Sequence, residues 1–107
     1  MKNKPSPILN ERKQTIEFII ENECARRITL AGSFNHWAKD DIMLRKKGRG
    51  IWSVKIPMPP GGKYQYKFII DDWMPMEDIN NPYREPDGIT GWNSVLIVGE
   101  PSGTWNY

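Results

Sequence analysis

Hydrophobic and polar residues alternate along most of this chain, and a period of two residues is typical of half-buried β-strands. The clearest example is the segment 63–70, in which large apolar side chains share one face while Gln65, Lys67 and Ile69 share the other. The same pattern predicts further strands in the segments 15–21, 26–32, 51–56 and 93–98.

Glycine and aspartate residues mark where several of these strands turn. Between residues 42 and 57 we expect a hairpin, with a first arm near Ile42–Lys46 and a turn that contains Gly48 and Gly50. The pair Asp71–Asp72 follows the strand 63–70 directly and is a candidate for a tight turn.

The remaining segments fit the same all-β pattern. Residues 73–76 can return as a short strand, and residues 77–91, rich in Asn, Pro, Asp and Gly, are expected to form a long ordered loop. No stretch shows the period of a helix. The strands and turns together predict an all-β chain that folds as an antiparallel β-sandwich.

The chain has 107 residues, which fits one domain with one hydrophobic core. Residues 1–13 are polar and contain two prolines, so they are expected to be a flexible N-terminal lead-in. The β-sandwich is expected to cover residues 14–99. Residues 100–107 show no clear period and are expected to form a C-terminal tail, in which Trp105 has no assigned place.

Charge is balanced, with 15 Lys and Arg against 13 Asp and Glu, for a net charge of +2. This balance does not indicate a nucleic acid or an anionic membrane as a partner. The single cysteine, Cys24, cannot form a disulfide within the chain. No apolar run approaches the roughly 20 residues of a membrane span, and the N-terminus has no signal-peptide pattern. These features favour a cytoplasmic location.

Residue types that carry catalysis are scarce. The only histidine is His36 and the only cysteine is Cys24, and the neighbours of each in the sequence suggest no catalytic partner. The adjacent carboxylates Asp40–Asp41 and Glu77–Asp78 are expected to be solvated rather than to form an acid–base pair. Metal-ligand spacings and phosphate-binding glycine loops are missing. We therefore expect no metal, no cofactor and no enzymatic activity.

Aromatic residues are numerous for a chain of this size, with 5 Trp and 4 Tyr. Trp52 alternates with core residues and is expected to be buried. Other tryptophans lie near amides and a lysine, a combination that suits a sugar. An indole can cover the C–H face of a pyranose ring, while lysine and amide groups form hydrogen bonds with the ring's hydroxyls. The sequence therefore favours a carbohydrate-binding site.

Four stretches of the chain resemble one known family. They are LAGSFNHW (30–37), YQYKFIIDDWMPMED (64–78), NPYREPDG (81–88) and WNSVLIV (92–98). In this order and spacing they resemble the family 48 carbohydrate-binding module. That family includes the glycogen-binding domain of the AMP-activated protein kinase beta subunit and the early-set domain that precedes the barrel of isoamylases and branching enzymes. The resemblance covers residues 14–99 and implies an immunoglobulin-like, early-set β-sandwich.

The resemblance also implies a binding site. In glycogen-binding members the site consists of two tryptophans, a lysine and an asparagine, and the matching positions here are Trp37, Lys67, Trp73 and Asn93. Trp37 would be one wall of a sugar platform, presented by the turn GSFN. In that turn Gly32 is expected to permit a tight exit from the strand, and Phe34 is expected to pack inward.

This sequence departs from the kinase-type pattern just before Asn93. The leucine and threonine of that pattern are matched here by Ile89 and Gly91, so Ile89 stays a candidate for sugar contact and the threonine hydroxyl is lost. Trp92 lies next to Asn93. It either adds a third aromatic platform or covers the end of the sandwich, and the sequence does not choose between these two roles.

Two functions fit these observations. The first is non-catalytic binding of an α-1,4-linked glucan such as glycogen, starch or maltodextrin. The second is a regulatory or bracing domain that binds a glycoside hydrolase or branching enzyme without binding sugar itself. Because the chain ends soon after its last strand, such bracing is expected in trans. A small glycoside hydrolase is disfavoured, since no sheltered carboxylate pair is visible and a catalytic barrel needs roughly 250 residues.

Overall fold

The computed structural model describes residues 5–99, so the predicted tail at 100–107, with Trp105, lies outside the described residues. The strands are β1 (Ile8–Asn10), β2 (Thr15–Glu21), β3 (Ile28–Gly32), β4 (Ile42–Met43), β5 (Arg45–Lys46), β6 (Ile51–Pro57), β7 (Gly62–Ile70), β8 (Met74–Met76), β9 (Arg84–Pro86) and β10 (Trp92–Val98). A short 3-10 helix, η1 (Ser33–Asn35), follows β3. Within the described residues no α-helix is present, and in particular no helix that is long and apolar enough to cross a membrane.

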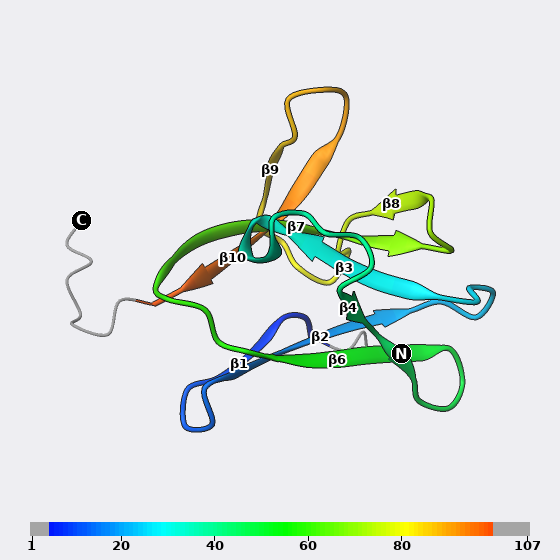
Figure 1. Ribbon diagram of the computed structural model, residues 1–107, viewed down its shortest axis with the longest axis horizontal. Helices are drawn as coiled ribbons and strands as arrows, with labels where there is room; N and C mark the ends of the chain where they lie inside the picture. The colour runs from blue at the N-terminus through cyan, green and yellow to red at the C-terminus, as the bar shows by residue number, and fades with distance from the viewer. Residues whose placement is uncertain (1–4, 100–107) are drawn as a thin grey trace.

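The strands form two antiparallel sheets that pack face to face (Figure 1). The first has the order β1-β2-β6-β5, and the second has the order β4-β3-β7-β10-β9, with β8 also paired to β7. The β9–β10 hairpin projects beyond the two layers at the top of Figure 1. The predicted all-β, immunoglobulin-like sandwich is therefore confirmed.

Inward-pointing side chains from the alternating strands of both sheets fill the core. Phe18 of β2 and Tyr66 of β7 are fully buried, and their rings meet edge to face with centroids 4.9 Å apart. Trp52 of β6 is buried as predicted, and its indole N–H donates to the carbonyl of Asn22 at 2.9 Å. Further buried side chains complete the core: Ile16, Ile20, Ile28, Leu30, Phe68, Leu96 and Val98.

The central strand β7 contributes outward-facing residues to the second sheet. It pairs with β3 along one edge and with β10 and then β8 along the other. The pairing with β10 reaches Tyr66 and the pairing with β8 begins at Phe68, so Lys67 lies where one neighbour replaces the other. Because Tyr66 and Phe68 point into the core, alternation places Gln65, Lys67 and Ile69 on the outer face.

The arm predicted at Ile42–Lys46 is not one strand. Its first part, β4, pairs with β3 in the second sheet, whereas β5 pairs with β6 in the first sheet. Leu44 lies between the two parts, is buried, and donates its N–H to the carbonyl of Ile28 at 2.9 Å. The chain therefore crosses from one layer to the other at Leu44, which an alternating pattern alone does not reveal. The turn with Gly48 and Gly50, both at positive φ, follows as predicted.

Two short strands lie where the sequence predicts irregular structure. β1 lies within the segment 1–13 that was expected to be a flexible lead-in, and β9 lies within the loop predicted at 77–91. Each has three residues, which is too short to show a period. Both depend on a longer neighbour, since β1 pairs with β2 and β9 pairs with β10.

The expectation that Glu77–Asp78 is solvated is wrong for Asp78, which is 2% exposed. Its Oδ2 accepts hydrogen bonds from the hydroxyls of Ser6 at 2.5 Å and Tyr66 at 2.8 Å, and its N–H donates to Ser94 Oγ at 2.8 Å. Burial raises the pKa of the Asp78 carboxyl. Burial and then the neighbouring Asp78 charge also raise the pKa of the Tyr66 hydroxyl. This cluster ties the N-terminal segment to the second sheet.

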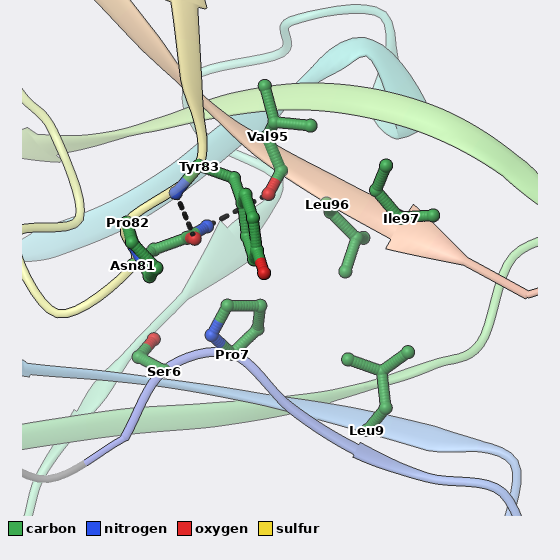
Figure 2. Close-up of a pocket in the computed structure, with 9 residues that line it drawn as sticks. All are labelled: Ser6, Pro7, Leu9, Asn81, Pro82, Tyr83, Val95, Leu96 and Ile97. Carbon is green, nitrogen blue, oxygen red and sulfur yellow. Dashed lines mark hydrogen bonds between the residues drawn. The ribbon is translucent and has the colours of Figure 1, made fainter.

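Beside this cluster the N-terminal segment and β10 enclose a largely apolar groove of about 220 Å³ (Figure 2). Pro7 and Leu9 lie on one side and Tyr83 and Ile97 on the other. Asn81 is the main polar side chain there, and its amide is already used by the protein, since Nδ2 donates to the carbonyl of Val95 at 2.9 Å. The groove therefore offers little to a molecule rich in hydroxyls.

Candidate functional site

A second groove, of about 550 Å³, lies on the outer face of the second sheet. Its floor is formed by outward residues of β7 and β10, and its walls by the loop after η1 and the loop between β9 and β10. The groove brings together four of the six predicted site residues, Trp37, Lys67, Ile89 and Asn93. Its other lining residues are Ala31, Lys39, Gln65, Ile69 and Asp87.

The loop after η1 holds Trp37 in an unusual backbone conformation. His36 and Trp37 both have φ near 58°, in the left-handed region that bulky residues seldom adopt. Asn35 stabilises this turn, because its Oδ1 accepts the N–H of Gly32 at 3.0 Å and its Nδ2 donates to the carbonyl of Ala38 at 3.2 Å. The Trp37 N–H donates to the carbonyl of Gly32 at 2.8 Å. These bonds hold the backbone of Trp37 at the groove, while the residue is 41% exposed.

Gly32 is needed here for close packing rather than for a special backbone angle. Its φ of −161° is extended and open to any residue. A Cβ at this position would lie 2.7 Å from the carbonyl oxygen of Gln65 and 2.7 Å from the ring of Phe34. Phe34 packs inward as predicted, against Phe18 and Tyr64, with ring centroids 6.1 Å apart in each pair. The turn is thus fixed from below by aromatic packing.

Lys67 is paired within the groove. Its Nζ lies 2.8 Å from Oδ2 of Asp87, and the two side chains are 19% and 14% exposed. The hydrogen bond from Lys67, followed by those from the backbone, holds the pKa of the Asp87 carboxyl well below its ordinary value. A lysine ammonium has three donors, so Lys67 can bind Asp87 and still donate to a ligand.

Asp87 also shapes the loop that carries Ile89. Its Oδ1 accepts the N–H groups of Ile89 at 2.9 Å and Gly91 at 3.1 Å. A Cβ at Gly91 would lie 3.2 Å from Oδ2 of Asp87, closer than an ordinary contact. The glycine that stands where the kinase-type pattern has threonine therefore fits this carboxylate. Ile89, 85% exposed, is left at the tip of the loop over the groove.

Asn93 forms part of the groove floor and is 7% exposed. Its Nδ2 donates to Oε1 of Gln65 at 2.7 Å, and the Nε2 of Gln65 donates to Glu85. Glu85 also pairs with Lys63. This row of polar side chains crosses from β7 to β10 and β9. It fixes the orientation of the Asn93 amide, and among residues 5–99 no hydrogen bond to its Oδ1 is found.

Trp73 does not line this groove. It follows the turn at Asp71–Asp72, where both aspartates have positive φ and the Trp73 N–H donates to the carbonyl of Ile70 at 3.1 Å. Its indole is 71% exposed and lies in a separate concavity beside Arg26 and Arg27. The tight turn predicted here is therefore present, and the tryptophan it carries stands apart from the four predicted residues that line the groove.

Trp92 faces the other side of β10 from Asn93, since neighbouring residues of a strand point in opposite directions. It is not among the residues that line the groove. The guanidinium of Arg84 lies 4.3 Å from the centre of its indole, and Arg84 also pairs with Glu77 at 3.3 Å. One face of this indole is thus occupied by a protein cation.

Comparison with known proteins identifies the family. The glycogen recognition site of AMP-activated protein kinase matches residues 14–102 of this chain. The chain belongs to this family. It is a carbohydrate-binding module of family 48, and the family match is to a non-catalytic domain.

Relatives of this module include 1,4-alpha-glucan branching enzymes. The enzyme of Synechococcus sp. (strain JA-3-3Ab) is 26% identical over 102 residues, which cover 94% of this chain and 13% of the enzyme. The enzyme of Clostridium perfringens (strain SM101 / Type A) is 34% identical over 67 residues, which cover 61% of this chain and 10% of the enzyme. The module thus spans only a small part of the length of these enzymes.

A solved structure shares the fold of the module. It is a crystal structure assigned as an alpha amylase from Salmonella typhimurium, with a TM-score of 0.61 and 18% sequence identity. The match covers 78% of this chain and 13% of that chain. The likeness supports the sandwich fold described above.

Three polar residues of the groove were not predicted as site residues. Gln65 shares the outer face of β7 with Lys67, and alternation alone could have added it to the site. Asp87 precedes Gly88 in a Pro-Asp-Gly turn, a signal for a loop-forming aspartate rather than for a site. Lys39 follows Trp37 by two residues, and no sequence pattern indicates that it faces the groove.

The groove of the module suits binding better than catalysis. Asp87 is the carboxylate that lines it, and the pairing with Lys67 keeps that group ionised. Among residues 5–99, no three His, Cys, Asp or Glu side chains gather in a way that could hold a metal ion. What the groove presents instead is an exposed indole, an ammonium group, an amide and an apolar loop tip.

Proposed function

We propose that this module binds α-1,4-linked glucan, such as glycogen, starch or maltodextrin, in the groove lined by Trp37, Lys67, Ile89 and Asn93. The observation that carries the proposal is that one groove holds an exposed indole on one wall and polar groups on its floor. Membership in a family of glycogen recognition sites supports the same ligand class. The module itself carries out no reaction in this proposal.

Each part of the groove has a role that follows from the structure of a sugar ring. The Trp37 indole stacks on the C–H face of one glucose unit, which contributes about 1–2 kcal/mol. Lys67 Nζ donates to a hydroxyl, and Asn93 Oδ1 accepts from one. Asp87 keeps Lys67 in place, and Ile89 packs against the edge of the ring. Such a site predicts a Kd of roughly 10 µM to 1 mM for one oligosaccharide.

Weak binding of one oligosaccharide is sufficient for a polymer ligand. Many copies of the same disaccharide unit lie along a glucan chain, so rebinding raises the apparent affinity. Glycogen should therefore retain the module in co-sedimentation even when maltoheptaose binds only in the millimolar range.

The test is a calorimetric titration of the intact chain with maltoheptaose. Trp37→Ala should weaken binding by about 5- to 30-fold through loss of the stack, and Lys67→Ala should weaken it without changing the fold. Lys55→Ala, on a strand of the other sheet, is the matched control for the loss of a lysine and should bind as the unchanged chain does. Absence of heat and of co-sedimentation with glycogen at millimolar sugar would reject the proposal.

A second proposal concerns the partner of the module. The relatives described above are branching enzymes of which the module matches only a small part. We propose that it associates with such an enzyme and holds it on a glucan. A pull-down should then retain a branching enzyme in the presence of excess maltodextrin. Loss of the enzyme under those conditions would mean that only a shared glucan connects the two.

A further inference from the structure

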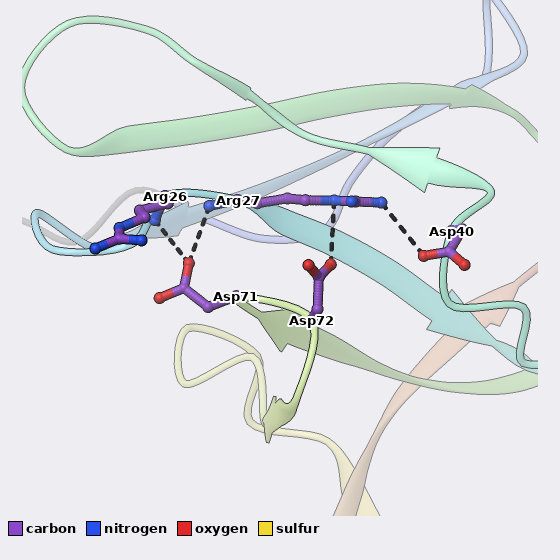
Figure 3. A network of polar contacts seen from close by, with 5 residues as sticks. All are labelled: Arg26, Arg27, Asp40, Asp71 and Asp72. Atoms are coloured by element: carbon purple, nitrogen blue, oxygen red, sulfur yellow. Dashed lines mark hydrogen bonds and ion pairs between the residues drawn. The ribbon is translucent and has the colours of Figure 1, made fainter.

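Arg27 lies between the two segments that carry Trp37 and Trp73. Its Nε is 3.2 Å from Oδ1 of Asp72, and its Nη2 is 3.3 Å from Oδ1 of Asp40 (Figure 3). Asp72 directly precedes Trp73, and Asp40 follows Trp37 by three residues. One guanidinium therefore connects the loop after η1 to the turn between β7 and β8.

The position of Arg27 is itself fixed at the backbone. Oδ1 of Asp71 accepts the N–H groups of Arg26 at 2.7 Å and Arg27 at 3.0 Å, and the Asp71 N–H donates to the carbonyl of Arg27 at 2.7 Å. Asp71 and Asp72 thus hold one residue by its main chain and by its side chain. Figure 3 shows the guanidinium extended along β3 between the two carboxylates that it pairs with.

We propose that Arg27 is a positioning residue that sets the separation of Trp37 and Trp73 for a single glucan chain lying across both indoles. The inference rests on the proposed function and extends the ligand beyond the groove to the separate concavity of Trp73. Ion pairs as exposed as these contribute little to folding, since the Asp40 side chain is 84% exposed. They do restrict two loops before the ligand arrives, which reduces the entropy lost on binding.

Arginine is suited to this role because its extended guanidinium reaches both carboxylates at once: Nη2 donates to Asp40, and Nε forms an ion pair with Asp72 without the geometry of a hydrogen bond. A lysine at this position has one ammonium group and can pair closely with either Asp72 or Asp40. The two carboxylates belong to different loops, so only the arginine holds both. This difference makes Arg27→Lys a sensitive variant, since it keeps the charge and removes the connection.

The test measures affinity for a long and a short sugar with Arg27→Met, Arg27→Lys and the matched control Arg45→Met. Arg45 is an exposed arginine of β5 in the first sheet, and its guanidinium forms none of the ion pairs found among residues 5–99. For maltoheptaose, Arg27→Met should weaken binding by about three- to tenfold, Arg27→Lys should fall between it and the unchanged chain, and Arg45→Met should have no effect. For maltose, which has only two glucose units, all four proteins should bind alike.

Asp40→Asn and Asp72→Asn each remove one of the two ion pairs and keep Arg27, so they serve if Arg27→Met does not fold. Each should weaken binding of maltoheptaose and leave binding of maltose unchanged. Equal losses for both sugars would assign Arg27 to folding alone, and no loss for maltoheptaose would remove it from the site. Either result overturns this inference, whereas unimpaired binding by Trp37→Ala would instead reject the proposed groove.

Discussion

The Nζ of Lys67 lies 2.8 Å from the carboxylate of Asp87, and the two residues approach the same groove from β7 and from the loop between β9 and β10. The pair fixes the groove floor to its wall. It also keeps an ammonium group at the surface of the groove without leaving that charge unpaired. Asp87 binds its proton more weakly in the folded chain than in the unfolded chain, because Lys67 and two backbone amides stabilise the carboxylate.

This relationship predicts a pH dependence of stability. A lowered pKa in the folded state stabilises the fold above the ordinary value of 3.8, and this stabilisation disappears as the pH falls below that value. The Tm of the unchanged chain should therefore fall more steeply than that of Asp87→Asn between about pH 5 and pH 2. Circular dichroism melts over this range measure it, with the exposed Asp41→Asn as control. Parallel curves for Asp87→Asn and the unchanged chain would contradict the pairing.

The buried Asp78 predicts a pH dependence of stability with the opposite sign. Burial raises its pKa in the folded chain, so its contribution to stability is largest below the ordinary value of 3.8 and declines as the pH rises through the folded pKa. Asp78→Asn removes this titration. Relative to the unchanged chain, its Tm should therefore improve as the pH rises from acid toward neutrality. Circular dichroism melts over the same pH range test this. If the Tm of Asp78→Asn instead falls further below that of the unchanged chain as the pH rises, the buried group is held as a stabilised carboxylate.

The parts of the fold that could be predicted are those in which the local sequence carries enough information. Strands β2 and β7 are long and half-buried, so their alternation shows in the sequence. Strands β1 and β9 have three residues each and form only because β2 and β10 lie beside them. The crossing at Leu44 was missed for a related reason, since alternation does not tell which sheet a residue joins.

The same distinction applies to the site. The outward direction of Lys67 follows from its position between Tyr66 and Phe68. The separation of Trp73 from the groove does not follow from any local pattern, because the turn after β7 contacts Arg27, which is 44 positions away from Asp71. Likewise, the contact between Asn93 and Gln65 joins residues that are 28 positions apart. Such contacts belong to the folded sheet rather than to either segment alone.

Replacing Gly32 should lower both the stability of the fold and the affinity for maltoheptaose. Gly32→Ala places a methyl group 2.7 Å from the Gln65 carbonyl of β7 and from the Phe34 ring, so the β7 backbone or the Phe34 ring must shift away from β3. We expect a loss of about 1–3 kcal/mol in the free energy of unfolding, together with weaker maltoheptaose binding because Trp37 shifts. Gly99→Ala is the control, since a Cβ there meets nothing within 4 Å. Urea denaturation distinguishes the two variants, and equal stability would show that the turn adapts.

The sequence leaves two roles open for Trp92, a third aromatic platform or a cover for the end of the sandwich, and a substitution can distinguish them. Its indole lies on the opposite side of β10 from Asn93 and packs against the Arg84 guanidinium at 4.3 Å. A structural role predicts that Trp92→Ala binds maltoheptaose within about twofold of the unchanged chain, while the free energy of unfolding falls by about 1 kcal/mol through loss of the cation–π contact and its buried area.

Arg84→Ala is the variant to compare with Trp92→Ala, because it removes the guanidinium that covers one face of the Trp92 indole. If Trp92 only packs, Arg84→Ala should lower stability by a similar amount, and the double variant should lose less than the sum of the two single losses. Sugar affinity should stay unchanged in all three variants. A loss of affinity in Trp92→Ala comparable to that in Trp37→Ala would instead make Trp92 a sugar platform, on the opposite face of the sheet from the groove.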